Sequence, residues 1–395
     1  MNAFLANPRF AFLPLTIFFA FLCSGSRAQP RRIDFSGKNT DIHMNISQVG
    51  DSVIYIPMQL PDSITVSQGT DICLADHYIL VKDRPMKQVL LLSRDGQFIR
   101  RISGNGIGLG EYTSFWDATL DEAGDRIFIL DSRKRLILVY SLHNEFIGII
   151  NVENEPIHLA ALGHERLLAI RPYEGKDQSQ LPHLYQLGYD GTVLQKTFLK
   201  EEAEHQDFTS FAQLYRYKDS LCLYQTEADT IFCIGQDGVV TPRYILTDKE
   251  MFPTVYRHSL ELIQQNFGSW FVVHNVFETP RYLFFNGAYK ARRRGMIYDK
   301  VTGQLNNVVY NTDRGMMDDA LQNDIDGGMP FWPTGQANEK YLYAILDPGK
   351  FRDIALSDYN KSLPFKDTVQ HAKMLDILSH TTGYGNPIIQ LIRTK

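Results

Sequence analysis

A tight turn recurs along the chain at nearly constant spacing. Four turns lie 46 to 49 residues apart, at Asp95–Gly96, Asn144–Glu145, Asp190–Gly191 and Asp237–Gly238, and a fifth follows at Thr302–Gly303. Asp-Gly between alternating apolar residues is a strong hairpin signal, because both central positions of such a turn favour positive φ. Strand-like apolar runs stand on both sides of each turn. A period of this length with about four strands per unit predicts the blades of a β-propeller.

Six copies of the unit predict an all-β fold, a six-bladed β-propeller of four-stranded antiparallel blades. A strand such as Arg135–Ser141 cannot bury its apolar faces alone, so the blades must stack around an axis. Strand-like segments at residues 51–60 and 385–395 are expected to meet in one blade, which closes the ring without a free edge. Residues 368–380 have apolar positions at helical spacing and predict a short C-terminal helix outside the last blade.

The first 28 residues have the pattern of a signal peptide. An apolar run over Phe10–Cys23 is followed by Ser26 and Ala28 at the −3 and −1 positions of a cleavage site. We expect the mature chain to begin at Gln29 and to be exported to the periplasm or cell surface, with lipid attachment at Cys23 as the alternative. The remaining divisions are an N-terminal extension, residues 29–50, and a single propeller domain, residues 51–395.

Composition excludes some partners. The chain has 395 residues and a net charge of −5, so it has no basic field that would attract nucleic acid. No stretch after the signal peptide reaches 18 consecutive apolar residues, so no transmembrane segment is expected in the mature chain. Oligomeric state is not indicated by any pattern.

The segment Gly104–Tyr112, GNGIGLGEY, is rich in glycine. Its spacing does not match the G-x-G-x-x-G of a dinucleotide-binding turn, and β-like residues follow where a helix would be needed. A P-loop would require Gly-Lys-Ser/Thr, whereas Glu111 follows the last glycine. We interpret the glycines as allowing a tight path between two blades. Glu111 is expected to accept backbone N–H bonds there, and Tyr112 to pack between the blades.

Residues 104–150 resemble an NHL-type blade, in which a G-x-G-x-G-E-aromatic loop precedes strands ending in Asp, in ILD and in VYS. The whole mature chain resembles the exported six-bladed β-propeller proteins of Bacteroidota. The shared features are the signal, this loop and the segments ETPRYLFF, MIYDKVTGQ, NDIDGGMPFWP and NPIIQLI. The resemblance implies the fold. Because most members of that family lack a defined activity, it implies no catalytic residue.

Several side chains are candidates for binding a ligand where propeller loops converge on the channel. Arginines can bind carboxylate or phosphate, and aromatic rings can stack on a sugar or peptide. Each candidate also has a structural alternative, which is a solvated hairpin loop for the arginines and packing between blades for the others. The candidates are Trp116, Asp117, Trp270, Arg292, Arg293, Arg294, Phe331 and Trp332. In the segment of Trp270, His274 and Glu278 fall on a possible common strand face, and Glu278 could approach Arg281.

A divalent-cation site is a weaker hypothesis. Asp324 and Asp326 place carboxylates at i and i+2 on a Gly-rich turn, a spacing that suits Ca²⁺. The alternative is an ordinary Asx-turn, which turn statistics favour.

Cys222 and Cys233 are equally distant from the centre of a predicted hairpin at Glu227–Ala228. They would then face each other across two strands, so a disulfide is a geometric possibility. The alternative is a pair of small apolar strand residues. Cys73 has no evident partner.

Two functions remain open. The first is an exported binding module that engages a glycan, peptide or protein partner at the channel face. The second is a metal-dependent hydrolase or lyase of the propeller lactonase or amidating-lyase type, for which no catalytic residue can be named because such sites assemble from single residues on many blades.

Overall fold

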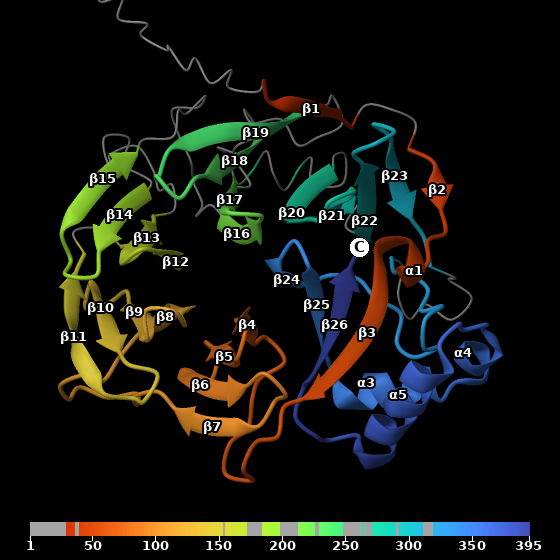
Figure 1. Ribbon diagram of the computed structural model, residues 1–395, viewed down its shortest axis with the longest axis horizontal. Coiled ribbons are helices and arrows are strands. Elements are labelled where there is room, and N and C mark those ends of the chain that lie inside the picture. Colours follow the sequence, from red (N-terminus) through yellow and green to blue (C-terminus); the bar gives the residue numbers. More distant parts are fainter. Residues whose placement is uncertain are drawn as a thin grey trace, which may run out of the picture.

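Six β-sheets stand around a central axis and form a closed ring (Figure 1). The computed structural model describes residues 29–35, 39–152, 155–171, 184–197, 212–225, 229–247, 261, 265, 271–289, 292–310 and 319–395. The predicted signal peptide and Trp270 lie outside these residues. The predicted six-bladed propeller is confirmed.

Each blade is a four-stranded antiparallel meander whose first strand is the innermost. Blade 1 contains β4 (Asp71–Leu74), β5 (Tyr78–Asp83), β6 (Gln88–Ser93) and β7 (Phe98–Arg101), and blade 2 contains β8 (Phe115–Asp121), β9 (Arg126–Asp131), β10 (Leu136–Tyr140) and β11 (Phe146–Asn151). Blade 3 contains β12 (His158–Gly163), β13 (Arg166–Ile170), β14 (Leu184–Gly188) and β15 (Val193–Thr197). Blade 4 contains β16 (Ala212–Tyr217), β17 (Ser220–Gln225), β18 (Thr230–Ile234) and β19 (Val240–Thr247), and blade 5 contains β20 (Phe271–Glu278), β21 (Tyr282–Tyr289), β22 (Arg292–Asp299) and β23 (Leu305–Val308).

Blade 6 joins the two ends of the chain. Its inner strands are β24 (Gly335–Asn338) and β25 (Tyr341–Leu346), followed by β26 (Ile388–Thr394) and, outermost, β3 (Gly50–Pro57). Strands β26 and β3 pair antiparallel over their whole length. The predicted closure is therefore confirmed, and it holds the ring shut by backbone hydrogen bonds.

The N-terminal extension adds a strand to each of two blades. Strand β1 (Arg31–Asp34) pairs in parallel with β19, and β2 (Asp41–Ile42) pairs in parallel with β23. These pairings cover the outer edges of blades 4 and 5, as Figure 1 shows at the top and right. No sequence pattern indicated β1 and β2, because both strands are short and their partner strands are more than 200 residues away.

Helices fill the connection between β25 and β26. They are α3 (Pro348–Ala355), α4 (Asp358–Ser362) and α5 (Thr368–His380), and a single turn, α1 (Ile46–Val49), precedes β3. Asp347 and Asp367 cap α3 and α5 by accepting backbone N–H bonds in the first turn.

The predicted helix at residues 368–380 is confirmed, and the structure shows which of its faces is buried. Met374 and Leu378 are buried, whereas Val369 and Leu375 are exposed. The apolar spacing was compatible with two faces, and contact with β3 selected the one with Met374.

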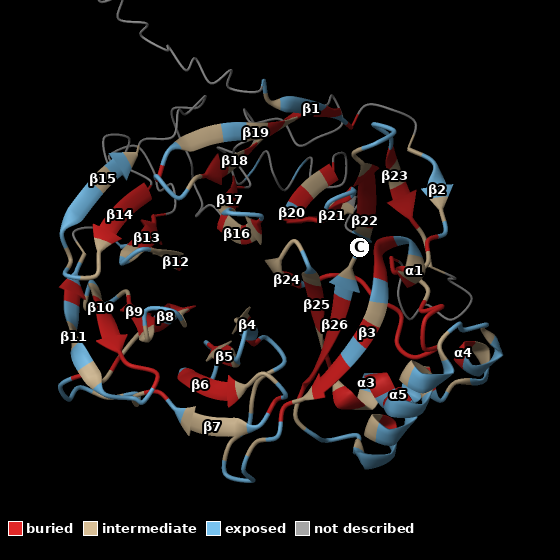
Figure 2. Ribbon diagram, viewed as in Figure 1, coloured by how far each residue is buried: buried red, intermediate tan, exposed pale blue. Residues whose placement is uncertain are grey.

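The core consists of six apolar clusters, one at each interface between neighbouring blades. Figure 2 shows the buried residues concentrated in the middle strands, while outer strands such as β15 are exposed. The largest cluster lies between blades 5 and 6 and extends to α3 and α5. Stability therefore depends on packing between blades, as the repeat pattern predicted.

The glycine-rich loop connects the outer strand of blade 1 to the inner strand of blade 2. Glu111 Oε2 accepts the N–H of Gly108 at 2.8 Å, and a Cβ at Gly106 would clash with the same carboxylate. Gly110 has φ +81°, a value that favours glycine. Tyr112 is fully buried between the blades. The architectural interpretation, including both side-chain roles, is confirmed.

Candidate functional site in the central channel

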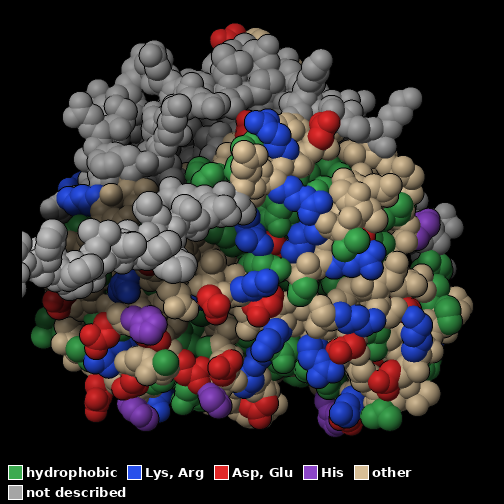
Figure 3. All heavy atoms as spheres, turned by 45° about the horizontal axis from the view of Figure 1, so that its top comes forward, with side chains coloured by type: hydrophobic (Ala, Val, Ile, Leu, Met, Phe, Trp, Pro, Cys, Tyr) green, Lys and Arg blue, Asp and Glu red, His purple; other side chains and the backbone are tan. Residues whose placement is uncertain are grey.

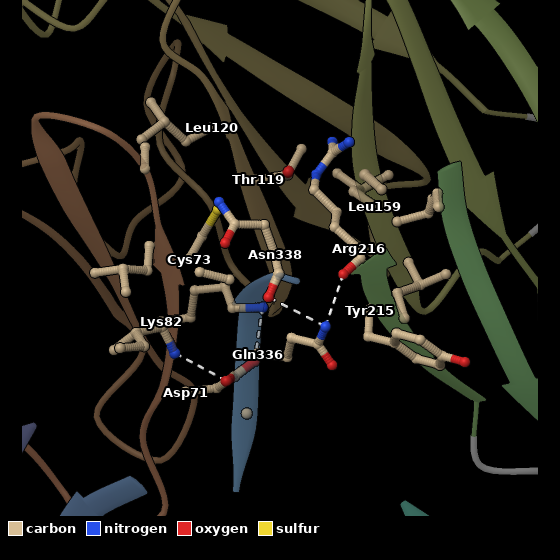
Figure 4. Close-up of a pocket in the computed structure, with 18 of the residues that line it drawn as sticks. Asp71, Cys73, Lys82, Thr119, Leu120, Leu159, Tyr215, Arg216, Gln336 and Asn338 are labelled. Carbon is tan, nitrogen blue, oxygen red and sulfur yellow. Dashed lines mark hydrogen bonds and ion pairs between the residues drawn. The ribbon is translucent and has the colours of Figure 1, made fainter. Parts of the chain in front are cut away.

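A cavity of about 840 Å³ lies on the axis of the ring. The first strands of all six blades contribute to its wall, and much of that wall is polar. Figure 4 shows Asp71 and Lys82 on one side of the pocket and Arg216 on the other, with Gln336 and Asn338 between them. Residues that are distant in sequence therefore share one accessible space.

Four charged or ionisable side chains form a cluster, the channel cluster, at one side of the cavity. Lys82 Nζ lies 2.7 Å from Asp71 Oδ2 and 3.0 Å from Asp117 Oδ1. Asp117 Oδ2 in turn lies 3.3 Å from His158 Nδ1. The side chain of Asp71 is 60% exposed, whereas that of Asp117 is 8% exposed. The cluster thus has one reachable carboxylate and one buried carboxylate, joined by a lysine.

The electrostatics of the cluster keep its central pair charged. Burial alone would raise the pKa of Asp117, but Lys82 and His158 outweigh it and hold this pKa well below its usual value. Burial alone would lower the pKa of Lys82, but Asp117 and Asp71 raise it well above its usual value. Lys82 and Asp117 therefore form an ion pair throughout the physiological pH range.

Side chains of the inner strands also connect neighbouring blades. The amide of Gln213 pairs with the backbone of Val276, donating at 2.8 Å and accepting at 2.6 Å. Gln336 does the same with the backbone of Glu278, at 2.6 and 2.7 Å. Asp117 Oδ2 accepts the N–H of Leu159 at 3.0 Å. These bonds satisfy backbone groups at the inner edges of the blades, where no strand pairs with them.

Of the predicted pair at the start of β8, only Asp117 lines the cavity. Trp116 points elsewhere, with the guanidinium carbon of Arg84 at 4.8 Å from its ring centroid. Its side chain is 37% exposed. Trp116 therefore presents a cation–π contact on the surface and no part of the channel wall.

The arginine triplet lies on a strand and not in a loop. Arg292, Arg293 and Arg294 begin β22 and pair with residues 287–289 of β21. Arg292 and Arg293 are exposed, and Arg294 is half-buried. The structural alternative of a solvated hairpin loop is therefore wrong for these three residues, because they pair with β21 as part of β22.

Phe331 and Trp332 lie in the core between blades 5 and 6, where both rings are buried. Trp332 packs edge-on against Phe284 at 5.7 Å, and its indole N–H donates to Asn286 Oδ1. As the chain is arranged here, neither ring has a face available for a ligand. The structure thus supports packing between blades for these two residues.

Asp324 and Asp326 point to different partners. Asp324 binds Lys366 Nζ at 2.6 Å and the N–H of Ser47 at 2.9 Å. Asp326 accepts from the N–H of Gly328 and from Asn323. Among the described residues, no group of three or more His, Cys, Asp or Glu side chains is placed to hold a metal ion. Asp324 and Asp326 thus bind separate partners within the protein, and the Ca²⁺ site stays a prediction.

Glu278 is the centre of a second charged group, the interface cluster, between blades 4 and 5. Its side chain is fully buried, and Arg243 binds both of its oxygens, at 3.0 and 2.7 Å. Lys300 Nζ lies 2.9 Å from Oε1, and the hydroxyl of Tyr244 donates to the same oxygen at 2.8 Å. The expected approach of Arg281 was wrong, because that side chain binds Asp299 at 2.8 Å.

His274 does not share an exposed face with Glu278. It is exposed at an irregularity in the pairing of β20 with β21, while Glu278 is buried. The expectation of a common face assumed a regular strand, and the register shift between Val273 and Asn275 removes that regularity.

Sequence reasoning missed most residues of the channel wall. Asp71, Lys82, His158 and Arg216 were not singled out, since they come from blades 1, 3 and 4 and form no local motif. One signal was present. Asp71, Asp117 and His158 each stand within the first three residues of an inner strand, and superimposing the repeats would have collected these three.

The fold has a counterpart among solved structures. A Bacteroides fragilis protein, named as a candidate exported protein, matches with a TM-score of 0.68 and 19% identity over 92% of this chain and 99% of that one. A DUF4221 family member from Bacteroides vulgatus matches with a TM-score of 0.48 and 9% identity, over 65% and 84% of the two chains. The predicted resemblance to exported propellers of this bacterial group is confirmed at the level of the fold.

Other comparisons concern the sequence. No curated protein matches the chain, and no described helix is long and apolar enough to cross a membrane. The model of one family, a domain of unknown function designated DUF4934, matches residues 30–393. That match spans the whole propeller together with both N-terminal edge strands. The chain therefore belongs to the DUF4934 family.

Proposed function

We propose that this protein is an exported binding module that takes a polar, charged segment of a peptide or protein partner into its central channel. The observation that carries the proposal is the axial cavity of about 840 Å³, to which all six blades contribute. Ligand sites in proteins commonly enclose about 300–1,000 Å³. A short peptide segment fits a space of this size.

The composition of the wall favours a peptide over a glycan. Sugar sites commonly present an exposed aromatic ring for stacking, and the aromatic side chains lining this cavity, Tyr215, Phe277 and Tyr343, are all buried. The accessible groups are carboxylate, guanidinium and amide. These groups match the ammonium, carboxylate and amide groups of a peptide.

Charge is separated across the cavity. Asp71 and Asp117 share one Lys82, which leaves the channel cluster with a net negative charge when His158 is neutral. Arg216 lies on the opposite side (Figure 4). A segment with one cationic and one anionic side chain would complement both sides.

Surface charge does not suggest a different partner. The chain has a net charge of −5, and acidic and basic side chains are interspersed over the lower part of the face in Figure 3. A nucleic acid would need a continuous basic surface. Export itself is proposed from the signal-like N-terminal segment.

Thermal unfolding with added ligands tests the proposal, because a ligand of the folded state raises apparent stability. The probes are the tetrapeptide Gly-Lys-Asp-Gly and, as the glycan counterpart, maltotetraose. We expect the peptide to raise Tm and the sugar to leave it unchanged. The variant Asp71→Asn should weaken peptide affinity by about tenfold, as the loss of one charged contact implies.

Asp353→Asn is the matched control, since Asp353 is exposed on α3 outside the ring. It should bind the peptide as the wild type does. Equal affinity in Asp71→Asn and wild type would remove the channel cluster from the site. A Tm increase with maltotetraose alone would overturn the choice of a peptide.

A further inference from the structure

Two thiols face each other in blade 4. Cys222 on β17 and Cys233 on β18 are direct partners in the antiparallel register. Their sulfur atoms are 3.0 Å apart, and both cysteines are free thiols. The predicted hairpin geometry is confirmed, and the disulfide itself remains a prediction. What the sequence did not indicate is that the two thiols have different surroundings.

Cys233 lines a pocket. A cavity of about 400 Å³ at the outer part of blade 4 is lined by Cys233 together with Thr241, Arg243 and Tyr244 of β19. Cys222 is fully buried and does not line this cavity. A small molecule that enters the pocket would therefore meet the sulfur of Cys233 first.

Arg243 supplies a positive charge beside that thiol. Its guanidinium is fixed by both oxygens of Glu278 and lies over the ring of Tyr217 at 4.6 Å. The hydrogen bond from Cys222 lowers the pKa of Cys233, and the charge of Arg243 lowers it further, against the effect of burial. The bond to Cys233, together with burial, raises the pKa of Cys222 far above its usual value.

We propose that Cys222 and Cys233 form a redox-active dithiol that reacts with small disulfides entering this pocket, with Cys233 as the attacking thiol and Cys222 as the resolving thiol. The proposal is independent of the channel, which lies on the other side of the blade's inner strand. The modification site is Cys233 at the rim of the propeller. The molecule that reacts with it is a low-molecular-weight disulfide.

The reaction balances in two exchange steps. Cys233 loses its proton to solvent and attacks one sulfur of the small disulfide, forming a mixed disulfide and releasing the first small thiolate, which takes up a proton. Cys222 then loses its proton and attacks Cys233 Sγ. The bond between the two cysteines forms as the second small thiolate leaves and is protonated. The protein is oxidised by two electrons, and the small disulfide is reduced to two thiols.

Mass spectrometry of the reduced full chain after incubation with oxidised glutathione tests the proposal. The wild type should lose two protons at this pair and retain no glutathione there. Cys222→Ser should retain one glutathione on Cys233, because no resolving thiol is present. Cys233→Ser should form an adduct on Cys222 more slowly by on the order of tenfold or more, since Cys222 is buried and keeps its proton. Cys73→Ser, which changes the half-buried thiol of the channel, should behave at this pair as the wild type does.

A second measurement needs no variant of the pair. Brief alkylation of the reduced wild type with iodoacetamide, followed by peptide mapping, should label Cys233 before Cys222. Equal labelling of the two, or adducts forming equally fast on Cys222 and Cys233 in the two serine variants, would overturn the assignment of roles. A wild type that accumulates the mixed disulfide without closing the internal bond would overturn the dithiol itself.

Discussion

The two charged clusters of this propeller are built from the same kinds of residue and differ in what remains reachable. In the interface cluster, Glu278 is fully buried and its two oxygens bind Arg243, Lys300 and Tyr244. In the channel cluster, Lys82 is shared by buried Asp117 and by Asp71, whose side chain is 60% exposed. In the interface cluster, the carboxylate oxygens bind only other groups of the protein. In the channel cluster, one carboxylate faces an open cavity.

The difference teaches how a propeller separates structure from function. A closed ion network between blades fixes their relative position, and breaking it leaves uncompensated charge in the core. An open network at the axis tolerates the loss of its exposed member and can exchange solvent for a ligand. The effect of a substitution on stability should therefore decrease from the interface cluster to the exposed end of the channel cluster.

The largest effect is expected at Glu278. The substitution Glu278→Gln keeps the size of the fully buried side chain and leaves Arg243 and Lys300, which are both partly buried, without their anion. Removing one partner of a buried ion pair costs about 3–5 kcal/mol. Urea unfolding should show a loss of this order in the free energy of unfolding, with an unchanged m-value.

Glu155→Gln is the control for this prediction. Glu155 pairs with Arg135 at 2.9 Å, and both side chains are more than half exposed. Exposed pairs contribute about 0–1 kcal/mol. If the two variants lose similar stability, the interface cluster is not the structural element that we describe.

Asp326 extends the comparison to a buried carboxylate without a cation bound to it. Burial raises its pKa to about 6, and its Oδ2 has no hydrogen-bond partner among the described residues. In the unfolded chain the pKa of an aspartate is about 4. Between pH values of about 4 and 6, Asp326 therefore keeps its proton in the folded state and releases it in the unfolded state. The free energy of unfolding should therefore fall as pH rises through this window, and it should stay reduced above pH of about 6.

The variant Asp326→Asn cannot ionise. Its free energy of unfolding should exceed that of the wild type by about 2–3 kcal/mol at pH of about 7, as the pKa difference implies. Near pH of about 4 the two values should be equal. Urea unfolding across this range measures the difference. Asp324→Asn should be less stable than the wild type at neutral pH, because Asp324 binds Lys366 at 2.6 Å and the pKa of Asp324 is lowered. A stability difference for Asp326→Asn that does not vary with pH would contradict the assignment.

The substitution Asp117→Asn should lower the free energy of unfolding less than Glu278→Gln does, although both residues are buried on inner strands. In Asp117→Asn the lysine keeps Asp71 at 2.7 Å, and the amide oxygen can still accept from Leu159. Loss of the charged hydrogen bond alone amounts to about 1.5–3 kcal/mol. Urea unfolding of Asp117→Asn and Glu278→Gln side by side measures which variant loses more free energy of unfolding. An equally large loss in Asp117→Asn would show that Asp71 does not compensate the charge of Lys82 when Asp117 is neutralised.

The contrast between the clusters also explains what the sequence could and could not predict. Turn spacing and the roles of Glu111 and Tyr112 are consequences of local chain geometry, so they were readable from short segments. Ring closure was readable from the strand-like segments at the two ends of the chain. The channel cluster joins blades 1, 2 and 3, and no single repeat contains more than a fragment of it.

The burial of Phe331 and Trp332 was not readable from the sequence for a related physical reason. An aromatic pair such as Phe331 and Trp332 has the same sequence pattern whether it fills a gap between blades or faces a ligand. Only the position of Phe284 and Asn286, more than 40 residues away, decides between these outcomes. Burial is a property of the assembled ring, and local pattern does not specify it.

The smallest effect on stability is expected for Asp71→Asn, and that small effect is what makes the residue informative. Lys82 keeps Asp117 at 3.0 Å, and the lost carboxylate was mostly solvated, so unfolding should change by less than about 1 kcal/mol. The same variant should lose peptide affinity, as proposed for the channel. Urea unfolding and peptide titration on one preparation separate the two. A stability loss as large as that of Asp117→Asn would place Asp71 among the structural residues, and the open side of the comparison would then lose its basis.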